Sequence, residues 1–102
     1  MAATIFEKNG STLTVKPSGR LDTATSPVLD SELRQNLDGV REMIMDFSDV
    51  EYISSGGLRV LLGMEQLMES RGGSLTLIHV NEHILEIFDL VGFMSLVTVV
   101  KD

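Results

Sequence analysis

A short apolar run, a polar loop and a long amphipathic segment follow one another in the middle of the chain, and this junction constrains the fold most. The run Met43–Met45 has the character of a strand buried on both faces. From Leu58 to Met68 apolar residues recur at helical spacing, which predicts a helix of about residues 57–71. The joint holds two serines and two glycines, namely Ser54, Ser55, Gly56 and Gly57. A strand that leads into a helix in this way predicts an α/β fold that presents the joint.

The serines of the joint stand where the helix begins. The first N–H groups of a helix have no partner within it, and the helix dipole makes this end partly positive. Ser54 or Ser55 can therefore cap the helix, which is the common role of serine at such a position. The position also suits a hydroxyl that accepts a phosphoryl group, because the charge of about −1.5 to −2 on a phosphoserine is stabilised there. Gly56 and Gly57 permit another stretch of backbone to approach closely.

Catalysis by these serines is not indicated. A nucleophilic serine needs a positioned base, and His79 and His83 are the only histidines in the chain. No motif links either histidine to Ser55, and a Gly-x-Ser-x-Gly elbow is absent. The sequence therefore predicts no catalytic residue and a protein that is not an enzyme.

Strand and helix patterns alternate along the rest of the chain. Asn9-Gly10 between two alternating runs predicts a type I′ hairpin, and Gly19–Thr23 and the segment 48–54 are predicted to be loops. We expect strands at residues 4–8, 11–17, 42–47, 74–80 and 96–100, and helices at residues 27–38, 57–71 and 82–91, the first capped by Ser26. The order ββαβαβα(β) predicts one α/β domain over residues 1–102, with a mixed central sheet of about four or five strands and three or four packed helices.

The composition excludes several classes of protein. A formal net charge of −7 argues against a nucleic-acid-binding protein and against electrostatic docking on an anionic membrane. Apolar runs fall far short of the roughly 20 residues of a membrane span, and no signal peptide is recognisable, so we expect a cytoplasmic protein without a membrane partner. The absence of cysteine excludes disulfides and zinc–thiolate sites. Asp46, Asp49 and Glu51 lack the spacing of a calcium loop, so we expect solvated carboxylates that make the neighbourhood acidic, with no metal and no cofactor.

The segment around the joint resembles the signature of STAS domains, in particular of the bacterial anti-sigma factor antagonists. That signature is an aromatic or apolar pair, Asp, Ser, a small residue, Gly and Leu. In this chain Tyr52 and Ile53 form the pair, and Ser54 stands where many members carry Asp. Ser55 takes the position of the phosphorylated serine, followed by the matching residues Gly56, Gly57 and Leu58. Gly19-Arg20-Leu21-Asp22 and Asp46-Phe47-Ser48 are also similar to family motifs, so the resemblance covers nearly the whole chain.

The resemblance implies a STAS fold and a switch in bacterial transcription regulation. The unphosphorylated form would bind an anti-sigma factor serine/threonine kinase and free a sigma factor. Phosphorylation at Ser55, or alternatively at Ser54, would end that binding, and a PP2C-type phosphatase would reverse the modification. Such partner-switching phosphoproteins act in stress response or sporulation signalling. Partner contacts are then expected at Asp22, Ser54, Ser55, Gly56, Gly57, Leu58, Arg59 and Leu62.

Several alternatives stay open at the level of the sequence. Asp22 is either a site residue or a turn-forming carboxylate that binds local N–H groups. Leu58 and Leu62 lie beyond the edge of the apolar arc of their helix, so they either form a docking strip or belong to a core that extends further around it. At the level of function, the alternative is a constitutive STAS scaffold, or a subunit of a transport or other signalling complex, without serine phosphorylation.

Overall fold

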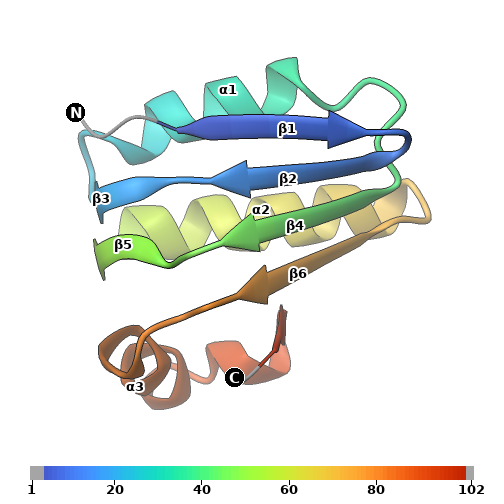
Figure 1. Cartoon of the computed structure of the whole chain (residues 1–102). Coiled ribbons are helices and arrows are strands. Elements are labelled where there is room, and N and C mark those ends of the chain that lie inside the picture. Colours follow the sequence, from blue (N-terminus) through green and yellow to red (C-terminus); the bar gives the residue numbers. More distant parts are fainter. Residues whose placement is uncertain (1–3, 101–102) are drawn as a thin grey trace.

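The computed structural model, which describes residues 4–100, contains a five-stranded mixed sheet with three α-helices (Figure 1). The sheet order is β1-β2-β4-β6-β7, with β1 antiparallel to β2 and all other neighbours parallel. Its strands are β1 Ile5–Asn9, β2 Thr12–Lys16, β4 Glu42–Asp46, β6 Ser74–Ile78 and β7 Thr98–Val99. The helices are α1 Ser26–Gln35, α2 Ser55–Ser70 and α3 Glu82–Leu90, followed by the 3₁₀ helix η1 Phe93–Ser95. The predicted α/β class with a mixed central sheet is confirmed.

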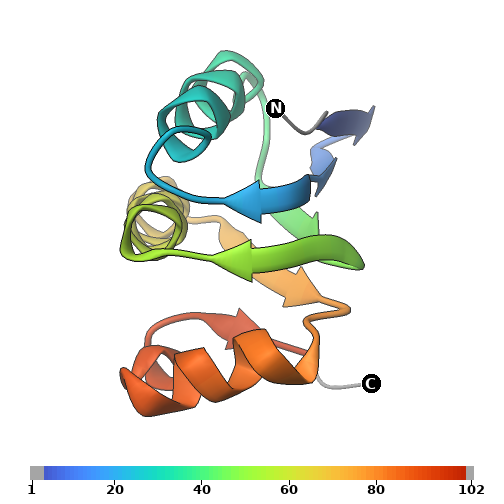
Figure 2. The ribbon, with the colours of Figure 1, turned by 90° about the vertical axis from the view of Figure 1, so that its left-hand side faces the viewer.

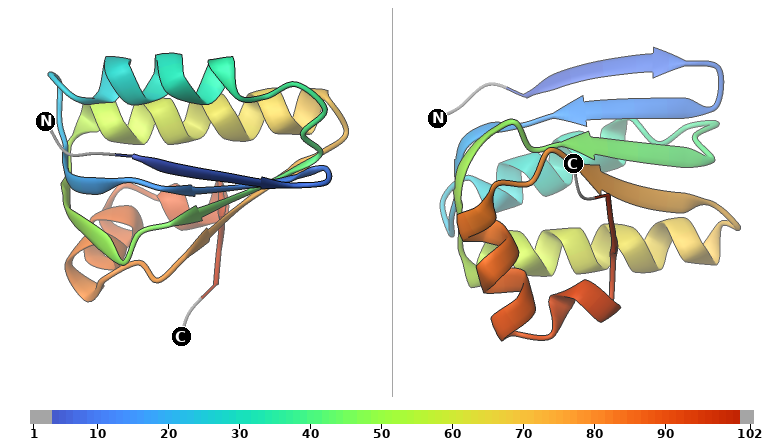
Figure 3. Two further views of the ribbon diagram at one scale, coloured as in Figure 1. Left: turned by 45° about the horizontal axis from the view of Figure 1, so that its top comes forward. Right: turned by 60° about the horizontal axis from the view of Figure 1, so that its bottom comes forward.

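Helices α1 and α2 lie side by side on one face of the sheet, as the views in Figure 2 and in the left panel of Figure 3 show. Both helices begin at the same end of the molecule. Helix α3 and η1 lie beyond β6, at the β7 end of the sheet (Figure 1). This arrangement brings the N-termini of α1 and α2 next to each other, although about 30 residues separate them in the sequence.

The strand β4 corrects the expectation of burial on both faces. Met43 and Met45 are fully buried under the helices, but Ile44 between them is half-exposed on the opposite face. Its neighbours in register, Thr14 on β2 and Thr76 on β6, are half-exposed as well. The sheet is therefore covered on one face by α1 and α2 and has the ordinary period-two alternation of a half-buried sheet.

One continuous core fills the space between the sheet and the helices. It takes its side chains from alternate positions of the strands and from one face of each helix. Phe88 of α3 and Phe93 of η1 close it at the β7 end, with ring centroids 4.9 Å apart. The fully buried large side chains are Phe47, Phe88, Leu13, Leu33, Met43, Met45, Ile53, Leu61, Met64, Met68, Leu75 and Leu77.

Two segments predicted to be loops are strands. β3 (Ser18–Leu21) and β5 (Asp49–Ile53) pair in parallel as a separate two-stranded sheet, with an irregularity between Gly19 and Arg20. Each strand is short and mostly polar, with apolar residues buried only at Leu21, Val50 and Ile53. Neither segment has the composition of a strand. Each becomes a strand because its backbone forms hydrogen bonds with the other segment, which is distant in the sequence.

The boundaries of α1 and the first hairpin also differ from expectation. Helix α1 has Thr25 at its N-cap position, so Ser26 is already helical, and it ends at Gln35 instead of reaching residue 38. The hairpin between β1 and β2 turns on Gly10 and Ser11, of which only Gly10 has a positive φ, at 62°. A type I′ turn needs positive φ at both central residues, so that prediction is wrong.

Two residues of α3 differ in burial and so test how this helix packs against the core. Phe88 is completely buried, whereas Leu90 is 86% exposed. We expect Phe88→Ala to lower the free energy of unfolding by about 3–5 kcal/mol, because it removes apolar contacts and leaves a cavity. Leu90→Ala should change it by less than about 0.5 kcal/mol. Urea unfolding of both variants measures the difference, and equal losses would contradict the position of α3 over the core.

Candidate functional site

The joint between β5 and α2 is fixed by the backbone of Ser54. This residue is the N-cap of α2 with φ −98° and ψ 178°. Its N–H donates to the carbonyl of Leu21 at the end of β3 (2.8 Å), and its carbonyl accepts from Leu58 N (3.0 Å). Its hydroxyl makes no capping bond and is buried without a hydrogen-bond partner among the described residues. Ser55, the first residue of α2, is exposed.

The two glycines of the joint differ in what they permit. A Cβ at Gly57 would lie 2.6 Å from Ile53 Cγ1 and 2.9 Å from the carbonyl oxygen of Leu21, so only glycine fits between α2 and β3. A Cβ at Gly56 would meet Ser54 Oγ at 3.5 Å and Ser26 Oγ at 3.7 Å, which are ordinary contacts. The expected close backbone approach is therefore required at Gly57 and not at Gly56.

Asp22 forms the loop that lies beside the joint. Its Oδ1 accepts hydrogen bonds from Ala24 N and Thr25 N, both at 3.0 Å, and Asp22 N donates to Thr25 Oγ1 at 3.0 Å. The bond from Thr25 N is the main cause of a pKa of Asp22 below the ordinary value. Desolvation, the second-largest effect, raises this pKa, and Ala24 N, the Thr25 hydroxyl and Arg20 lower it further. The interpretation of Asp22 as a turn-forming carboxylate is confirmed, and the turn places Thr23 against Gly56.

A groove opens between α1 and α2 next to the joint, and sequence reasoning did not find it. Its volume is about 560 Å³. The residues that line this interhelix groove are Thr23, Ser26, Pro27, Asp30, Arg34, Gly56, Arg59, Val60 and Gly63. The only signal in the sequence was the polar back of α2, where Arg59 and Gly63 stand, because the packing of α1 against α2 cannot be read from either helix alone.

The predicted site residues therefore separate into two groups. Ser55, Gly56 and Arg59 lie at the surface of the joint or along the groove, and the loop of Asp22 adjoins them. Leu58 and Leu62 are half-buried and pack against the core. The structure thus favours the wider core for Leu58 and Leu62, although each keeps some exposed surface.

The acidic residues before the joint do not gather around it. Asp49 begins β5 and pairs with Lys16 Nζ at 3.6 Å, and a strand rise of about 3.3 Å per residue puts it roughly 16 Å from Ser54. Asp46 lies still earlier; its carboxylate accepts from Ser48 N at 2.9 Å and contacts His79 Nδ1 at 3.0 Å. Desolvation raises the pKa of Asp46, but these hydrogen bonds outweigh it, so that the pKa lies below its ordinary value.

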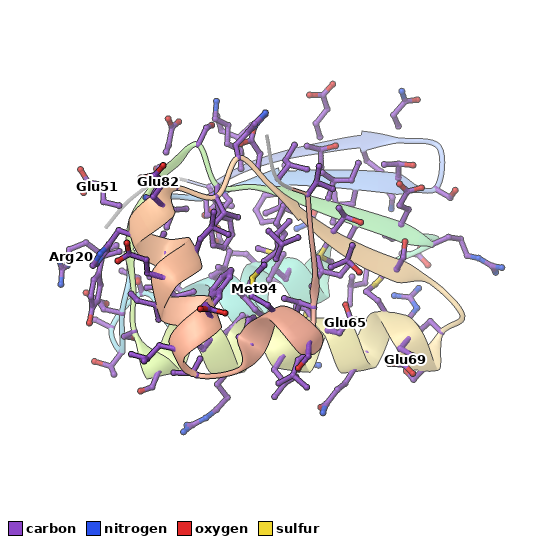
Figure 4. All side chains as sticks on the ribbon, turned by 90° about the horizontal axis from the view of Figure 1, so that it is seen from below. Arg20, Glu51, Glu65, Glu69, Glu82 and Met94 are labelled. Carbon is purple, nitrogen blue, oxygen red and sulfur yellow. The ribbon has the colours of Figure 1, made fainter. Side chains whose placement is uncertain are left out.

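On β5 itself, Glu51 is exposed, and Tyr52 stacks under the guanidinium of Arg20 with 4.3 Å from Cζ to the ring centroid. Figure 4 shows Arg20 and Glu51 at the same end of the molecule. Among residues 4–100, no three His, Asp or Glu side chains are grouped to hold a metal ion, and no helix has the length and apolarity to cross a membrane.

Comparisons with known proteins agree on one family. The chain matches the family model described as Mlab, STAS domain, over residues 5–98. It is 34% identical over 79 residues to BtrV of Bordetella bronchiseptica, whose name assigns it provisionally to the anti-sigma factor antagonists; the match covers 76% of this chain and 68% of BtrV. It is 27% identical over 93 residues to the anti-sigma-B factor antagonist of Bacillus subtilis, covering 91% of this chain and 85% of that protein.

Solved structures show the same fold. The anti-sigma factor antagonist SpoIIAA in its unphosphorylated form superposes with a TM-score of 0.77 at 16% identity, covering 98% of this chain and 89% of SpoIIAA. The phosphorylated form of Bacillus SpoIIAA superposes with a TM-score of 0.75 at 17% identity, covering 98% and 93%. At these identities the likeness establishes the fold.

Gly57 provides a test of the joint. We expect Gly57→Ala to destabilise the protein by about 1–3 kcal/mol, because the added methyl group overlaps Ile53 and the carbonyl of Leu21. The matched control is Gly63→Ala in the same helix, where nothing lies within 4 Å of the new Cβ. That variant should gain up to about 1 kcal/mol from helix propensity. Thermal or urea unfolding distinguishes the two, and a neutral Gly57→Ala would contradict the contact with β3.

The Asp22 turn should make the free energy of unfolding depend on pH in the acidic range. Since the pKa of Asp22 is lower in the folded than in the unfolded chain, its carboxylate stabilises the fold at pH values above the ordinary pKa of the unfolded chain, and this contribution is lost as the pH falls through the folded pKa. The stability difference between wild type and Asp22→Asn should therefore shrink on acidification from about pH 6 to pH 2. Asp38→Asn, in an exposed loop, is the control. A difference independent of pH, measured by urea unfolding, would count against the turn.

Proposed function

The chain belongs to the STAS domain family, and on that basis we propose that it is an anti-sigma factor antagonist switched by phosphorylation of Ser55. Two relatives bear the name of such antagonists, and SpoIIAA has been solved in phosphorylated and unphosphorylated forms. The observation that carries the choice of residue is the contrast between the two serines. The hydroxyl of Ser54 is buried, whereas Ser55 is exposed at the first position of α2.

Exposure decides which serine a kinase can use. A phosphoryl transfer to Ser54 would first have to open the contact between the start of α2 and the end of β3, since Ser54 N is bonded to Leu21 O and the Ser54 hydroxyl is buried. Ser55 needs no such opening. A phosphate on Ser55 would sit at the partly positive end of a 16-residue helix, where negative charge is stabilised. Phosphorylation is therefore expected to leave the fold intact.

The phosphate is expected to weaken binding of the partner. In the proposed mechanism the unphosphorylated protein binds an anti-sigma factor serine/threonine kinase through the Asp22 loop, the residues 54–58 and Arg59, which frees a sigma factor. A dianion on Ser55 then occupies the interface, and burying it without a counter-charge is costly. A loss of about 1–3 kcal/mol weakens binding roughly 5- to 150-fold. Asp49 lies at the start of β5, roughly 16 Å along the strand from Ser54, so its negative charge adds little to this effect.

The protein in this proposal is a substrate and a binding module of the cytoplasm, not an enzyme. The kinase uses ATP and magnesium to phosphorylate Ser55, so the chain needs no cofactor of its own. A PP2C-type phosphatase would restore the active form by removing the phosphate from Ser55, which its exposure permits.

Phosphopeptide mass spectrometry after incubation with the cognate anti-sigma serine kinase and ATP tests the proposal. We expect one phosphate on Ser55, none in Ser55→Ala, and an unchanged yield in Ser54→Ala, because the Ser54 hydroxyl accepts no capping bond from the first turn of α2. A PP2C-type phosphatase should remove the phosphate. The phosphorylated protein should bind the kinase roughly 5- to 150-fold more weakly than the unphosphorylated one.

Two other outcomes would redirect the proposal. Phosphate on Ser54 with the same loss of binding would keep the switch and move its position by one residue. Stable partner binding without phosphate on either serine would instead support a constitutive STAS subunit of a transport or other signalling complex.

A further inference from the structure

We propose that the interhelix groove seats an acidic segment of the partner, in which a carboxylate stands beside an apolar side chain. The inference rests on the proposed function and specifies the chemistry of the docked partner. It predicts that the contact surface extends from Ser55 along the space between α1 and α2, beyond the residues of the family signature.

Glycine keeps the groove open. A Cβ added at Gly63, in the middle of α2, would meet nothing within 4 Å, so internal packing does not require glycine there. Glycine inside a helix costs about 1 kcal/mol relative to alanine. On the α2 side, the groove is therefore free of side chains at Gly56 and at Gly63, and between these two glycines only Arg59 and Val60 line it. Gly63 thus lowers helix stability although no packing contact within the protein requires a glycine there, which is consistent with a surface that another chain approaches closely.

The groove is continuous with the proposed contact at Ser55. The end of the groove at the joint is formed by Thr23, Ser26 and Gly56, and Gly56 directly follows Ser55 in the sequence. The parallel course of α1 and α2 in the left panel of Figure 3 carries it away from the joint along both helices. A partner that covers the Ser55 hydroxyl therefore reaches the groove without a second, separate contact.

The charge of the groove selects an acidic occupant. Asp30, its single carboxylate, is paired with Arg34 at 3.0 Å, whereas Arg59 forms no ion pair with any residue from 4 to 100. The lining is thus net positive in a chain whose formal net charge is −7. The apolar part of the lining, with Pro27 and Val60, offers contact to an aliphatic side chain next to the carboxylate.

The opposite side of α2 has the reverse charge. Figure 4, seen from below, shows Glu65 and Glu69 on α2 and Glu82 on α3, on the side turned away from α1. Burial raises the pKa of Glu65, and the negative charge of the neighbouring Glu69 raises it further. An acidic segment would be repelled from that side, so the charge distribution favours the groove as its place of docking.

Ser26 adds an unused donor at the floor of the groove. Its side chain is 2% exposed, and its hydroxyl has no hydrogen-bond partner among the described residues. Gly56 has no side chain to cover it from the side of α2. A carboxylate seated at this end would lie beside a buried polar group that the free protein leaves unpaired.

Arg59 links the groove to the switch. Ser55 and Arg59 are four residues apart on α2, so their side chains lie on the same face. Once Ser55 is phosphorylated, the negative group lies N-terminal to the positive one, which is the more stabilising order for such a pair. The phosphate would therefore compete with the partner's carboxylate for the guanidinium of Arg59. Phosphorylation would thus weaken binding both by its own charge and by withdrawing this cation.

Calorimetric titration of the cognate anti-sigma serine kinase into purified variants tests the inference. Gly63→Leu should fill the groove and weaken binding about 10- to 100-fold, and Arg59→Glu should do the same by reversing its charge. The matched controls are Gln66→Leu, which places the same side chain at an exposed position of α2 outside the groove lining, and Arg41→Glu, which makes the same charge change at an exposed position outside the groove. Both controls should stay within about threefold of wild type, and thermal unfolding confirms that each variant is folded.

The outcomes separate this inference from the function on which it rests. If wild type binds, Ser55→Asp does not, and both groove variants match their controls, the groove inference is wrong and the switch stands. If Arg59→Glu binds more tightly, the occupant is basic and the inference is also wrong. If wild type binds no kinase at all, the proposed function itself fails.

Discussion

The contact between the end of β3 and the start of α2 is the constraint on which the site depends. Ser54 N donates to Leu21 O, and Gly57 lies so close to the same carbonyl that a methyl group would overlap it. The bond sets where α2 begins, and the lack of a side chain sets how near α2 lies to β3. The Asp22 turn, which follows Leu21 directly, is consequently held against the N-terminus of α2. A loop that is polar in sequence is thereby held in one position.

That constraint also gives two adjacent serines different surroundings. Ser54, drawn toward β3 by its backbone bond, has a buried hydroxyl, while Ser55 faces outward from the first turn of the helix. The same geometry places Ser26, at the start of α1, across from Gly56. Two helix N-termini and the turn of Asp22 therefore meet at one end of the molecule. A charge added there acts on any protein that covers this end, without disturbing the core beneath α2.

Much of the architecture follows from local patterns. The alternation of Leu13 and Val15, the helical spacing from Leu58 to Met68 and the positions of Gly72 and Gly92 after helices are each local signals, and the structure agrees with them. The strands β3 and β5 were missed because each is short and polar and becomes a strand only by pairing with the other. The half-exposed Ile44 was misjudged because a run of three apolar residues does not reveal that only one face of the sheet is covered.

The sequence by itself determined the fold class, the family and the position of the serine joint, because periodicity, turn residues and the Ser55-Gly56-Gly57-Leu58 pattern are properties of neighbouring residues. Only the tertiary structure decided that the Ser54 hydroxyl is buried, that Asp22 serves a turn beside the joint, and that a groove with a positive rim lies between α1 and α2. Burial and grooves arise from contacts between segments far apart in the chain. No local pattern encodes the distance at which α1 and β3 pack against α2.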